Sequence, residues 1–462
     1  MNVSRTVVIS VFHSFVTRNL LYGSALKKLE MAGLHIVLLV PAEKYSHFRD
    51  LFKEQGIEIV SVDNTRLTSL PRNTFLQRLS FLLIRSHYLW YKQVERRDER
   101  PGIRATLKYV FEHAFVRMFA NRPLPRFIYR KLYRWYADTS LVEDVIRQFQ
   151  PAFFVSTDVF DLTDRVCLLA AARLGIKTIG MVRSWDNCYS KGLLPIIPDH
   201  LLVNTHYLKE EAVQLHDVPA EHIEVIGLPQ MDSFLSLPTM DRTAFMHSVG
   251  ADPKEKLIVF APGGSILTDI DWQICEILRE AIQSGKIRYP AHVLVRNHPH
   301  HPADLSRFNT DKHFTIEHPG RVLSTNSKET ELLPGDQEHL YQTLAAADVV
   351  LWVATTLGID TAMLDRPQIM VNFDGFEQRE YLKSVRKFHD EDHMKKFVAT
   401  SGAHVARTKE DLVEWINRYL DDPSLDHVGR QRIVETQIIF TDGKSGERFA
   451  DAILHAIVST RV

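Results

Sequence analysis

The sequence predicts an α/β protein built from two doubly wound domains, each a parallel sheet with helices on both faces. Two observations lead to this prediction. Short, continuously apolar segments alternate with segments of helical period along most of the chain, which is the pattern of parallel strands covered on both sides. The chain also has 462 residues, more than one hydrophobic core usually supports, so two cores are the default.

The expected strands fall into two series. The first comprises 7–12, 35–40, 57–62, 153–156, 178–182, 201–203 and 224–227. The second comprises 256–261, 292–296, 314–317, 348–353 and 368–372. Helical segments such as 19–31 and 340–347 lie between strands, as the crossovers of a parallel sheet require.

The two series set the expected domain boundaries. We place a first domain at 1–235, a linker at 236–252 after a turn-rich segment, and a second domain at 253–440. The remaining segment, 441–462, is expected to carry a final amphipathic helix that packs back on the first domain.

A basic helical insertion interrupts the first series at about 66–140. From Arg66 to Asp138 there are sixteen Lys or Arg residues against five Asp or Glu, interleaved with aromatic residues. This pattern suits an anionic membrane surface or a lipid diphosphate. It is equally typical of a solvated basic face over an aromatic core. Nucleic acid would also be attracted, but no recognition motif accompanies the stretch, and we expect no nucleic-acid partner.

Composition points to a globular protein of a reducing compartment. Apolar residues make up 45% and charged residues 24% of the chain, and its three cysteines show no metal-binding spacing. No apolar run reaches the roughly 18 residues of a membrane span, and no leader-like segment precedes the first strand. We expect a cytoplasmic protein, with peripheral attachment to the inner face of the cell membrane through 66–138.

Ligands of doubly wound sheets bind beyond the carboxyl ends of the strands, so the residues at these ends are candidates. In the first half these are His13, Asp158 and the Trp185-Asp186 pair. We expect them on the acceptor side of a reaction. Asp186 is either a general base or a turn carboxylate that caps the next segment, and Asp158 is the second candidate for the base.

The second half offers groups suited to an anion. Gly263, Gly264 and Ser265 follow a strand, where glycine lets backbone N–H groups approach a phosphate, although a plain turn explains them as well. Arg296 and His298 follow the next strand and could stabilise a diphosphate leaving group. The spacing of His298 with the neighbouring histidines is not that of a standard zinc site, so we expect no metal.

Thr355 and Thr356 stand where an expected strand gives way to a helix. Two hydroxyls and unpaired backbone N–H groups meet there, which favours a diphosphate, while a simple helix cap is the alternative. Asp360 follows one turn later, within reach of the ribose of the same nucleotide.

Several short motifs carry a family resemblance. They are Gly227-x-Pro229-x-x-Asp232, His298-Pro299, the Thr355-Thr356 pair with Asp360 and Pro367, and Asp442-Gly443-Lys444 with Glu447 and Arg448. Because these motifs occur in this order, the chain resembles the CDP-glycerol glycerophosphotransferases, a teichoic-acid-polymerase-like group of GT-B transferases. The resemblance extends from about Ser184 to the C-terminal end. The chain resembles the non-hydrolysing UDP-N-acetylglucosamine 2-epimerases more loosely. The resemblance implies a GT-B fold, with two Rossmann-like domains facing across a cleft.

One motif departs from the family pattern. The Trp-His-Gly-x-x-x-Lys element of the family, whose His is the presumed base there, looks like Trp185-Asp186-Asn187-x-x-x-Lys191. The resemblance therefore places the base role on Asp186 and Lys191 on the acceptor side. An aspartate base is common among inverting GT-B glycosyltransferases, which favours sugar transfer over transfer of glycerol phosphate.

Together these features predict a metal-independent transferase without a cofactor. Asp186 would accept the proton of an acceptor hydroxyl, His298 and Arg296 would stabilise the leaving diphosphate, and the other second-half residues would bind the donor. The expected partners are a nucleotide sugar or CDP-glycerol and a surface-polysaccharide or lipid-linked acceptor. Two alternatives remain: a nucleotide-sugar 2-epimerase of the same fold, and a nucleotide-sugar-binding protein without catalysis.

Overall fold

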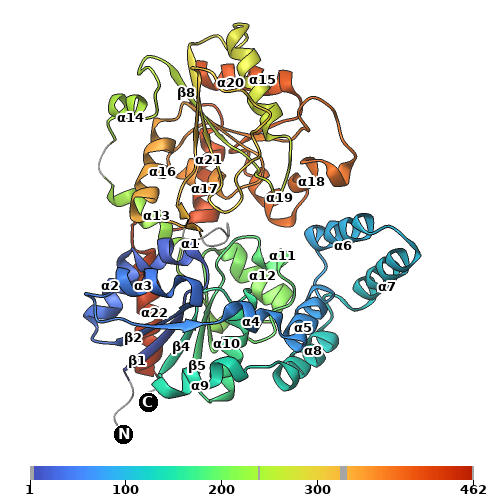
Figure 1. The fold of residues 1–462 in the computed structure, drawn as a ribbon, viewed down its shortest axis with the longest axis vertical. Helices are drawn as coiled ribbons and strands as arrows, with labels where there is room; N and C mark the ends of the chain where they lie inside the picture. The colour runs from blue at the N-terminus through green and yellow to red at the C-terminus, as the bar shows by residue number, and fades with distance from the viewer. Residues whose placement is uncertain (1–4, 238–239, 323–329, 460–462) are drawn as a thin grey trace. The chain divides into compact units, whose positions relative to one another are not determined.

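The computed structural model describes residues 5–237, 240–322 and 330–459. The chain forms two compact units (Figure 1). Unit 1 contains Met1–Asp232 and Asp442–Val462, and unit 2 contains Ser233–Thr441. Each unit has its own sheet and its own hydrophobic core.

Unit 1 is built on a seven-stranded sheet within its described residues, and every pairing in it is parallel. The strand order is β3-β2-β1-β4-β5-β6-β7. The strands are β1 (Thr6–Ser10), β2 (His35–Pro41), β3 (Glu58–Val62), β4 (Phe153–Ser156), β5 (Lys177–Met181), β6 (His200–Val203) and β7 (Ile223–Val225). The doubly wound parallel sheet expected from the first series is confirmed.

Helices cover both faces of this sheet because successive strand residues point to opposite sides. Val7 and Ile9 pack with α2 (Ser24–Met31), α3 (Tyr45–Leu51) and α22 (Ser445–Ser459). Val8, between them, belongs to the core on the other face. That core includes α9 (Ser140–Phe149), α10 (Leu162–Arg173) and α12 (His206–His216).

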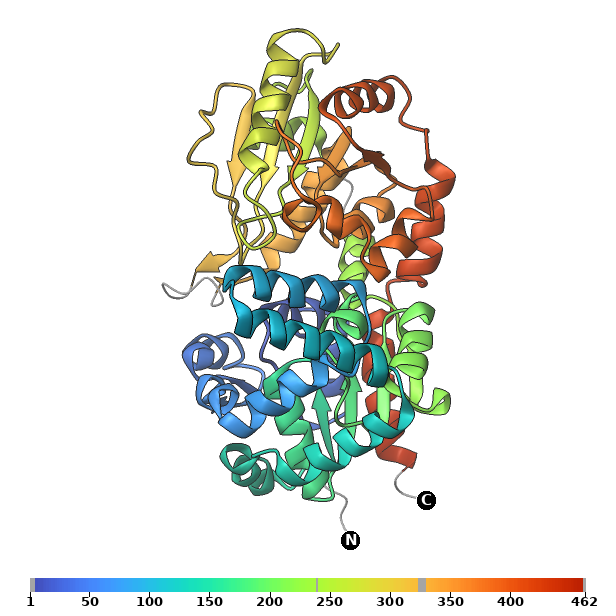
Figure 2. The ribbon, with the colours of Figure 1, turned by 90° about the vertical axis from the view of Figure 1, so that its right-hand side faces the viewer.

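The insertion between β3 and β4 is helical throughout most of its length (Figure 2). Its helices are α4 (Asn64–Ser69), α5 (Pro71–Phe81), α6 (His87–Glu99), α7 (Ile103–Phe119) and α8 (Pro123–Tyr136). Leu67, Leu76 and Tyr133 join the core of unit 1. By contrast, α7 buries none of its residues.

Unit 2 contains a second parallel sheet, six-stranded within its described residues, with the order β10-β9-β8-β13-β14-β15. The strands are β8 (Lys256–Ala261), β9 (Ala291–Arg296), β10 (Phe314–Glu317), β13 (Val349–Trp352), β14 (Gln368–Val371) and β15 (His404–Ala406). A short antiparallel pair, β11 (Arg321–Val322) and β12 (Thr330–Glu331), stands apart from it. The second doubly wound sheet is therefore also confirmed.

The helices of unit 2 again lie on both faces of the sheet. One core unites β8 and β9 with α15 (Asp271–Gln283) and α20 (Lys409–Asp421). On the other side α16 (Pro334–Ala346) contacts β8, and α17 (Leu357–Met363) contacts β13 and β14. The remaining helices are α14 (Arg242–Ser248), α18 (Arg386–His389), α19 (Asp392–Val398) and α21 (His427–Ile433).

The structure differs from the sequence expectation in local details. The helix expected at 19–31 is divided at Gly23: Tyr22 N–H bonds the Thr17 carbonyl in a wider π-type turn, and α2 begins only at Ser24. The turn-rich segment after Gly227 forms α13 (Pro229–Ser236), since proline is well suited to the first helical position. Within 236–252, α14 is capped by Asp241, whose carboxylate accepts from Ala244 N–H.

Candidate active site

The sheet of unit 1 has its topological switch point between β1 and β4. From this point the chain winds toward β3 on one side and toward β7 on the other, and ligands of this fold class bind at the carboxyl edge there. The two segments that leave the strands are tied together. Thr157 Oγ1 donates to the Ser10 carbonyl (2.7 Å), and Thr157 N–H donates to Ser10 Oγ (3.2 Å).

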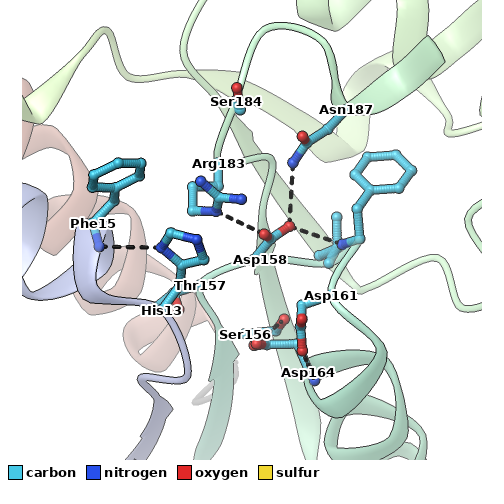
Figure 3. A network of polar contacts seen from close by, with 12 residues as sticks. His13, Phe15, Ser156, Thr157, Asp158, Asp161, Asp164, Arg183, Ser184 and Asn187 are labelled. Atoms are coloured by element: carbon cyan, nitrogen blue, oxygen red, sulfur yellow. Dashed lines mark hydrogen bonds and ion pairs between the residues drawn. The ribbon is translucent and has the colours of Figure 1, made fainter. Parts of the chain in front are cut away.

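Asp158 is the centre of a polar network at this edge (Figure 3). Its buried carboxylate accepts from Arg183 Nε (2.7 Å), from Asn187 Nδ2 (3.3 Å) and from Phe160 N–H (3.1 Å). Burial lowers the pKa of the Arg183 guanidinium, but the charge and hydrogen bond of Asp158, together with the charges of Asp186 and Asp161, raise that pKa overall. Asp158 is thus a fixed counter-ion for Arg183, with both carboxylate oxygens engaged.

Two further carboxyl groups, Asp161 and Asp164, follow Asp158 at intervals of three residues. Burial and the charges of neighbouring carboxylates raise the pKa of each, and that of Asp164 well above its usual range. Asp164 accepts from the hydroxyls of Ser10 and Ser156, and so links α10 to the ends of β1 and β4. Sequence reasoning missed this pair; the Asp-x-x-Asp-x-x-Asp spacing after a buried strand is the signal that indicates it.

Asp186 lies one turn beyond Arg183, at the start of α11 (Asn187–Ser190). Its two oxygens accept from Ser184 Oγ (2.6 Å) and Ser190 Oγ (2.7 Å). The carboxylate is close enough to Arg183 to help raise the pKa of that guanidinium. The structure therefore brings Asp158 and Asp186 together around Arg183. Arg183 was not among the site residues expected from the sequence.

The other residues expected on the acceptor side lie at the same edge of unit 1. Trp185 is partly buried, and Lys191 is exposed while its carbonyl accepts from Arg165. His13 caps α1 (Ser14–Val16): Phe15 N–H donates to its Nδ1 (3.2 Å). A neutral His13 ring consequently carries its proton on Nε2.

Unit 2 repeats the arrangement, with its switch point between β8 and β13. Thr355 and Thr356 follow β13 after two intervening residues, and Thr356 is exposed at the start of α17. Thr355 Oγ1 accepts from Leu357 N–H at 3.3 Å. Asp360 lies in the first turn of α17 and is half-buried. The hydroxyl pair thus stands where the sequence places it, at the edge where a ligand is expected.

The glycine loop after β8 is already engaged inside unit 2. Gly263 N–H and Gly264 N–H donate to the two oxygens of Asp271 (3.0 and 2.9 Å), and Ser265 N–H donates to the Pro302 carbonyl (3.3 Å). Gly264 has φ +77°, and a Cβ there would stand 2.1 Å from the His301 carbonyl oxygen. Phosphate binding by this loop stays a prediction, and it requires the N–H groups to leave Asp271.

The buried Asp271 carboxyl predicts a pH-dependent stability. Burial raises its pKa from 3.8 to about 6, against the opposing bonds from Gly263 and Gly264. Its proton is held more tightly in the folded state, so the free energy of unfolding falls by about 2 to 3 kcal/mol as the pH rises from about 4 to about 6, and is flat above. We expect Asp271→Asn to remove this slope in urea titrations. An unchanged slope in the variant contradicts the assignment.

Arg296 and His298 lie after β9 in different surroundings. The Arg296 guanidinium is only 8% exposed and donates to Glu317 (3.3 Å), which also binds His339 (2.8 Å). Burial lowers the pKa of Arg296 by more than the charges of Glu317 and Asp336 raise it. Its charge is compensated within unit 2, so its expected part in stabilising a leaving group stays a prediction.

His298 lies in a loop with two other histidines. His300 N–H donates to His298 Nδ1 (3.1 Å), which leaves the proton of a neutral His298 on Nε2. The rings of His298 and His301 stack 5.5 Å apart. Within the ranges that the structure describes, no three His, Cys, Asp or Glu residues are placed to hold a metal ion.

A cavity of about 570 Å³ opens at the carboxyl ends of β14 and β15. Its walls include Asn372, Phe376, Tyr381, Arg386 and Arg407. Asn372 is 8% exposed, and its Oδ1 accepts no hydrogen bond from any residue that the structure describes. This cavity was not predicted from the sequence, although aromatic and charged residues gather after β14.

Comparison with known protein families places the chain in context. The model of the CDP-Glycerol:Poly(glycerophosphate) glycerophosphotransferase family matches residues 183–455. This range begins at Arg183 and includes Asp186, all of unit 2 and most of α22. A search of curated proteins found no match.

Solved structures share the fold at low sequence identity. MnaA from S. aureus in complex with UDP gives a TM-score of 0.57 at 11% identity, covering 97% of this chain and 96% of that one. UDP-GlcNAc 2-epimerase from Neisseria meningitidis, bound to UDP-GlcNAc, gives a TM-score of 0.54 at 10% identity, covering 97% of this chain and 100% of that one. The wall teichoic acid polymerase TagF also matches, with a TM-score of 0.48 at 13% identity, covering 99% of this chain and 90% of that one. No conclusion is based on this match, because its TM-score is too low.

Proposed function

Since the chain belongs to the CDP-Glycerol:Poly(glycerophosphate) glycerophosphotransferase family, and is thus a transferase that uses a nucleotide-linked donor, we propose the following reaction for it. A glycosyl or glycerophosphate group moves from a nucleotide-diphosphate donor to a hydroxyl of a surface-polysaccharide or lipid-linked acceptor. The acceptor oxygen forms the new bond to the transferred group, the bond to the nucleotide breaks, and the hydroxyl proton passes to the base.

One observation carries this proposal. The family match runs without interruption from Arg183, through the Asp186 segment of unit 1, and through every carboxyl-edge loop of unit 2. The segments that would supply the base and bind the donor therefore both belong to the matched region. Neither group depends on the unmatched first 182 residues.

Asp186 is our choice for the base over Asp158. Asp158 has both oxygens engaged, one of them by Arg183 at 2.7 Å, and it is buried. Asp186 is only half-buried, and the hydroxyls of Ser184 and Ser190 orient it. Hydroxyl protons can turn away as a reacting proton arrives, whereas an ion pair must break.

The donor would bind at the switch point of unit 2. We assign the diphosphate to the Thr355 and Thr356 hydroxyls and to His298, which can donate from Nε2, with Arg296 as a further charge and Asp360 on the ribose. The neighbouring cavity of about 570 Å³ gives the rest of the donor room. We propose that neither a metal nor a cofactor takes part, because these side chains supply the donors that a departing phosphate needs.

Donor binding provides the first test. Thermal shifts with CDP, UDP, GDP, CMP, CDP-glycerol and a UDP-sugar will identify the donor, since a ligand at about one hundred times its Kd adds about 2.7 kcal/mol of stability. We expect Thr355→Val with Thr356→Val to weaken that donor roughly tenfold or more, because two hydrogen bonds to a charged group are lost.

The matched control is Thr436→Val, which removes a hydroxyl of unit 2 that bonds only the Arg432 carbonyl among the contacts described. Equal affinity in the double variant and the control contradicts the donor site. Product analysis then separates the functions: an epimerase converts the donor sugar without an acceptor, and a binding protein leaves the donor intact.

We further propose that the enzyme reaches a lipid-linked acceptor by peripheral attachment to a membrane. Among the residues that the structure describes, no helix has both the length and the apolar character to cross a bilayer. Attachment would therefore take place through surface groups, and the basic insertion of unit 1 is the region that supplies them.

A further inference from the structure

Helices α6 and α7 form an antiparallel pair within the insertion of unit 1 (Figures 1 and 2). The chain reverses at Gly102, whose φ of +150° is readily available only to glycine. Arg97 covers the Tyr109 ring at 5.0 Å and so joins the two helices. Both helices precede the region that the family model matches.

A cavity of about 540 Å³ lies between α6 and α7 and is strongly basic. Five cationic side chains line it against two acidic ones, Glu99 and Glu112; the cations are Arg96, Arg97, Arg100, Arg104 and Lys108. Glu112 is compensated by Arg96 (3.6 Å) and Lys108 (3.8 Å). Arg100 and Arg104 form no ion pair within the described part of the chain, so their charges are available to an anion.

The same helix α7 carries an exposed apolar stripe. Ile103, Leu107, Val110, Phe111 and Met118 are each between 56% and 81% exposed. Their spacing of four, seven, eight and fifteen residues from Ile103 places them within about a third of the helix circumference. Ala105, Tyr109 and Glu112, on the opposite side, line the basic cavity. Arg104 and Lys108 stand between the stripe and the cavity.

This arrangement fits one kind of partner. An exposed apolar stripe of this size marks an interaction site, and a helix with such a stripe beside Lys and Arg residues lies in the interface of an anionic bilayer. A soluble polyanion would use the charges but would leave the stripe in water. A protein partner could cover the stripe but has no general need of a basic cavity beside it.

We propose that the α6–α7 cavity binds the headgroup phosphate of an anionic phospholipid, while the α7 stripe enters the acyl boundary beside it. The proposal rests on the peripheral attachment proposed above, and it depends on no catalytic assignment. It adds a defined phosphate site, centred on Arg100 and Arg104, to what would otherwise be diffuse electrostatic attraction.

Vesicle flotation of the full chain tests the proposal. The probes are phosphatidylcholine vesicles with and without phosphatidylglycerol. We expect binding only with phosphatidylglycerol, and a roughly twenty-fold or greater weakening in Arg100→Glu with Arg104→Glu, since each cation near such a surface contributes a factor of about five. The matched control is Lys27→Glu with Lys53→Glu, two exposed cations of unit 1 outside the insertion, which should bind as the unaltered protein does.

A second pair of variants separates the cavity from the stripe. Leu107→Gln with Phe111→Gln should weaken binding to the vesicles with phosphatidylglycerol but keep the remaining binding dependent on that lipid, whereas the arginine variant should lose this dependence. The proposal is overturned if the arginine variant floats like the control, or if it keeps the preference for phosphatidylglycerol. Because flotation requires no turnover, it reports on the cavity even if the proposed transferase activity fails.

Discussion

Replacing Asp186 by alanine is expected to lower kcat by about 10²- to 10⁴-fold, the usual contribution of a general base. Donor affinity should remain unchanged, because the residues assigned to the donor belong to unit 2. Ser184 and Ser190 each lose a hydrogen-bond acceptor in the variant; Ser184 is half-buried, where water can replace it, whereas Ser190 is buried and its hydroxyl must turn to another acceptor. The measurements are initial rates and donor titrations on the same preparation.

The comparison variants make this result specific. Asp144→Ala removes an exposed carboxylate of unit 1 that pairs only with the surface residue Arg147 among the contacts described, and its rate should match that of the unaltered enzyme. Asp186→Asn keeps the shape and one oxygen that accepts from a serine hydroxyl, while its amide N–H₂ can donate to the other serine oxygen, so it should be as slow as Asp186→Ala. An active Asp186→Asn enzyme rules out the proton-transfer role.

Replacing Arg183 by methionine is expected to destabilise unit 1 by about 3 to 5 kcal/mol, because it leaves the buried Asp158 charge without its partner. Asp161 and Asp186 stand close enough to act on Arg183, so the loss also exposes Asp158 to like charges. Amide hydrogen exchange in β4 and β5 measures the destabilisation locally, which matters in a chain of two units.

The double variant Arg183→Met with Asp158→Asn completes a thermodynamic cycle. Removing both charges should recover most of the lost stability, since a neutral amide can keep the Phe160 N–H bond. If the single and double variants are equally destabilised, the loss comes from the packing of Arg183 rather than from its charge.

The strands were the part of the fold that the sequence predicts best. Buried parallel strands are continuously apolar, so 153–156 and 256–261 agree to the residue with β4 and β8; 314–317 also agrees with β10, an edge strand that alternates apolar and polar residues. Strand β15 was missed because it has only three residues, His404–Ala406, of which the first two are half-buried at the edge of the sheet, and because it begins with a polar residue. Helix α13 was missed because Gly227 and Pro229 are typical of turns as well as of helix starts.

The candidate site could be predicted only in part, for a physical reason. Residue type and position after a strand are visible in the sequence, and they sufficed to place Asp158, Asp186 and the Thr355-Thr356 pair at carboxyl edges. Hydrogen-bond partners depend on the fold. That Asp271 holds the N–H groups of the glycine loop, and that Glu317 neutralises Arg296, follows from contacts between segments that the sequence leaves unpaired.

Helix α22 has a consequence for how the protein is made. Its first N–H groups, those of Ser445 and Gly446, donate to Asp232, and Phe449 and Ile453 lie in the same core as β1. The amino-terminal unit therefore stays open on one face during translation until its last helix emerges, by which time all of Ser233–Thr441 has left the ribosome. The later-synthesised unit can fold first, and the nascent amino-terminal unit needs protection of its exposed core in the meantime.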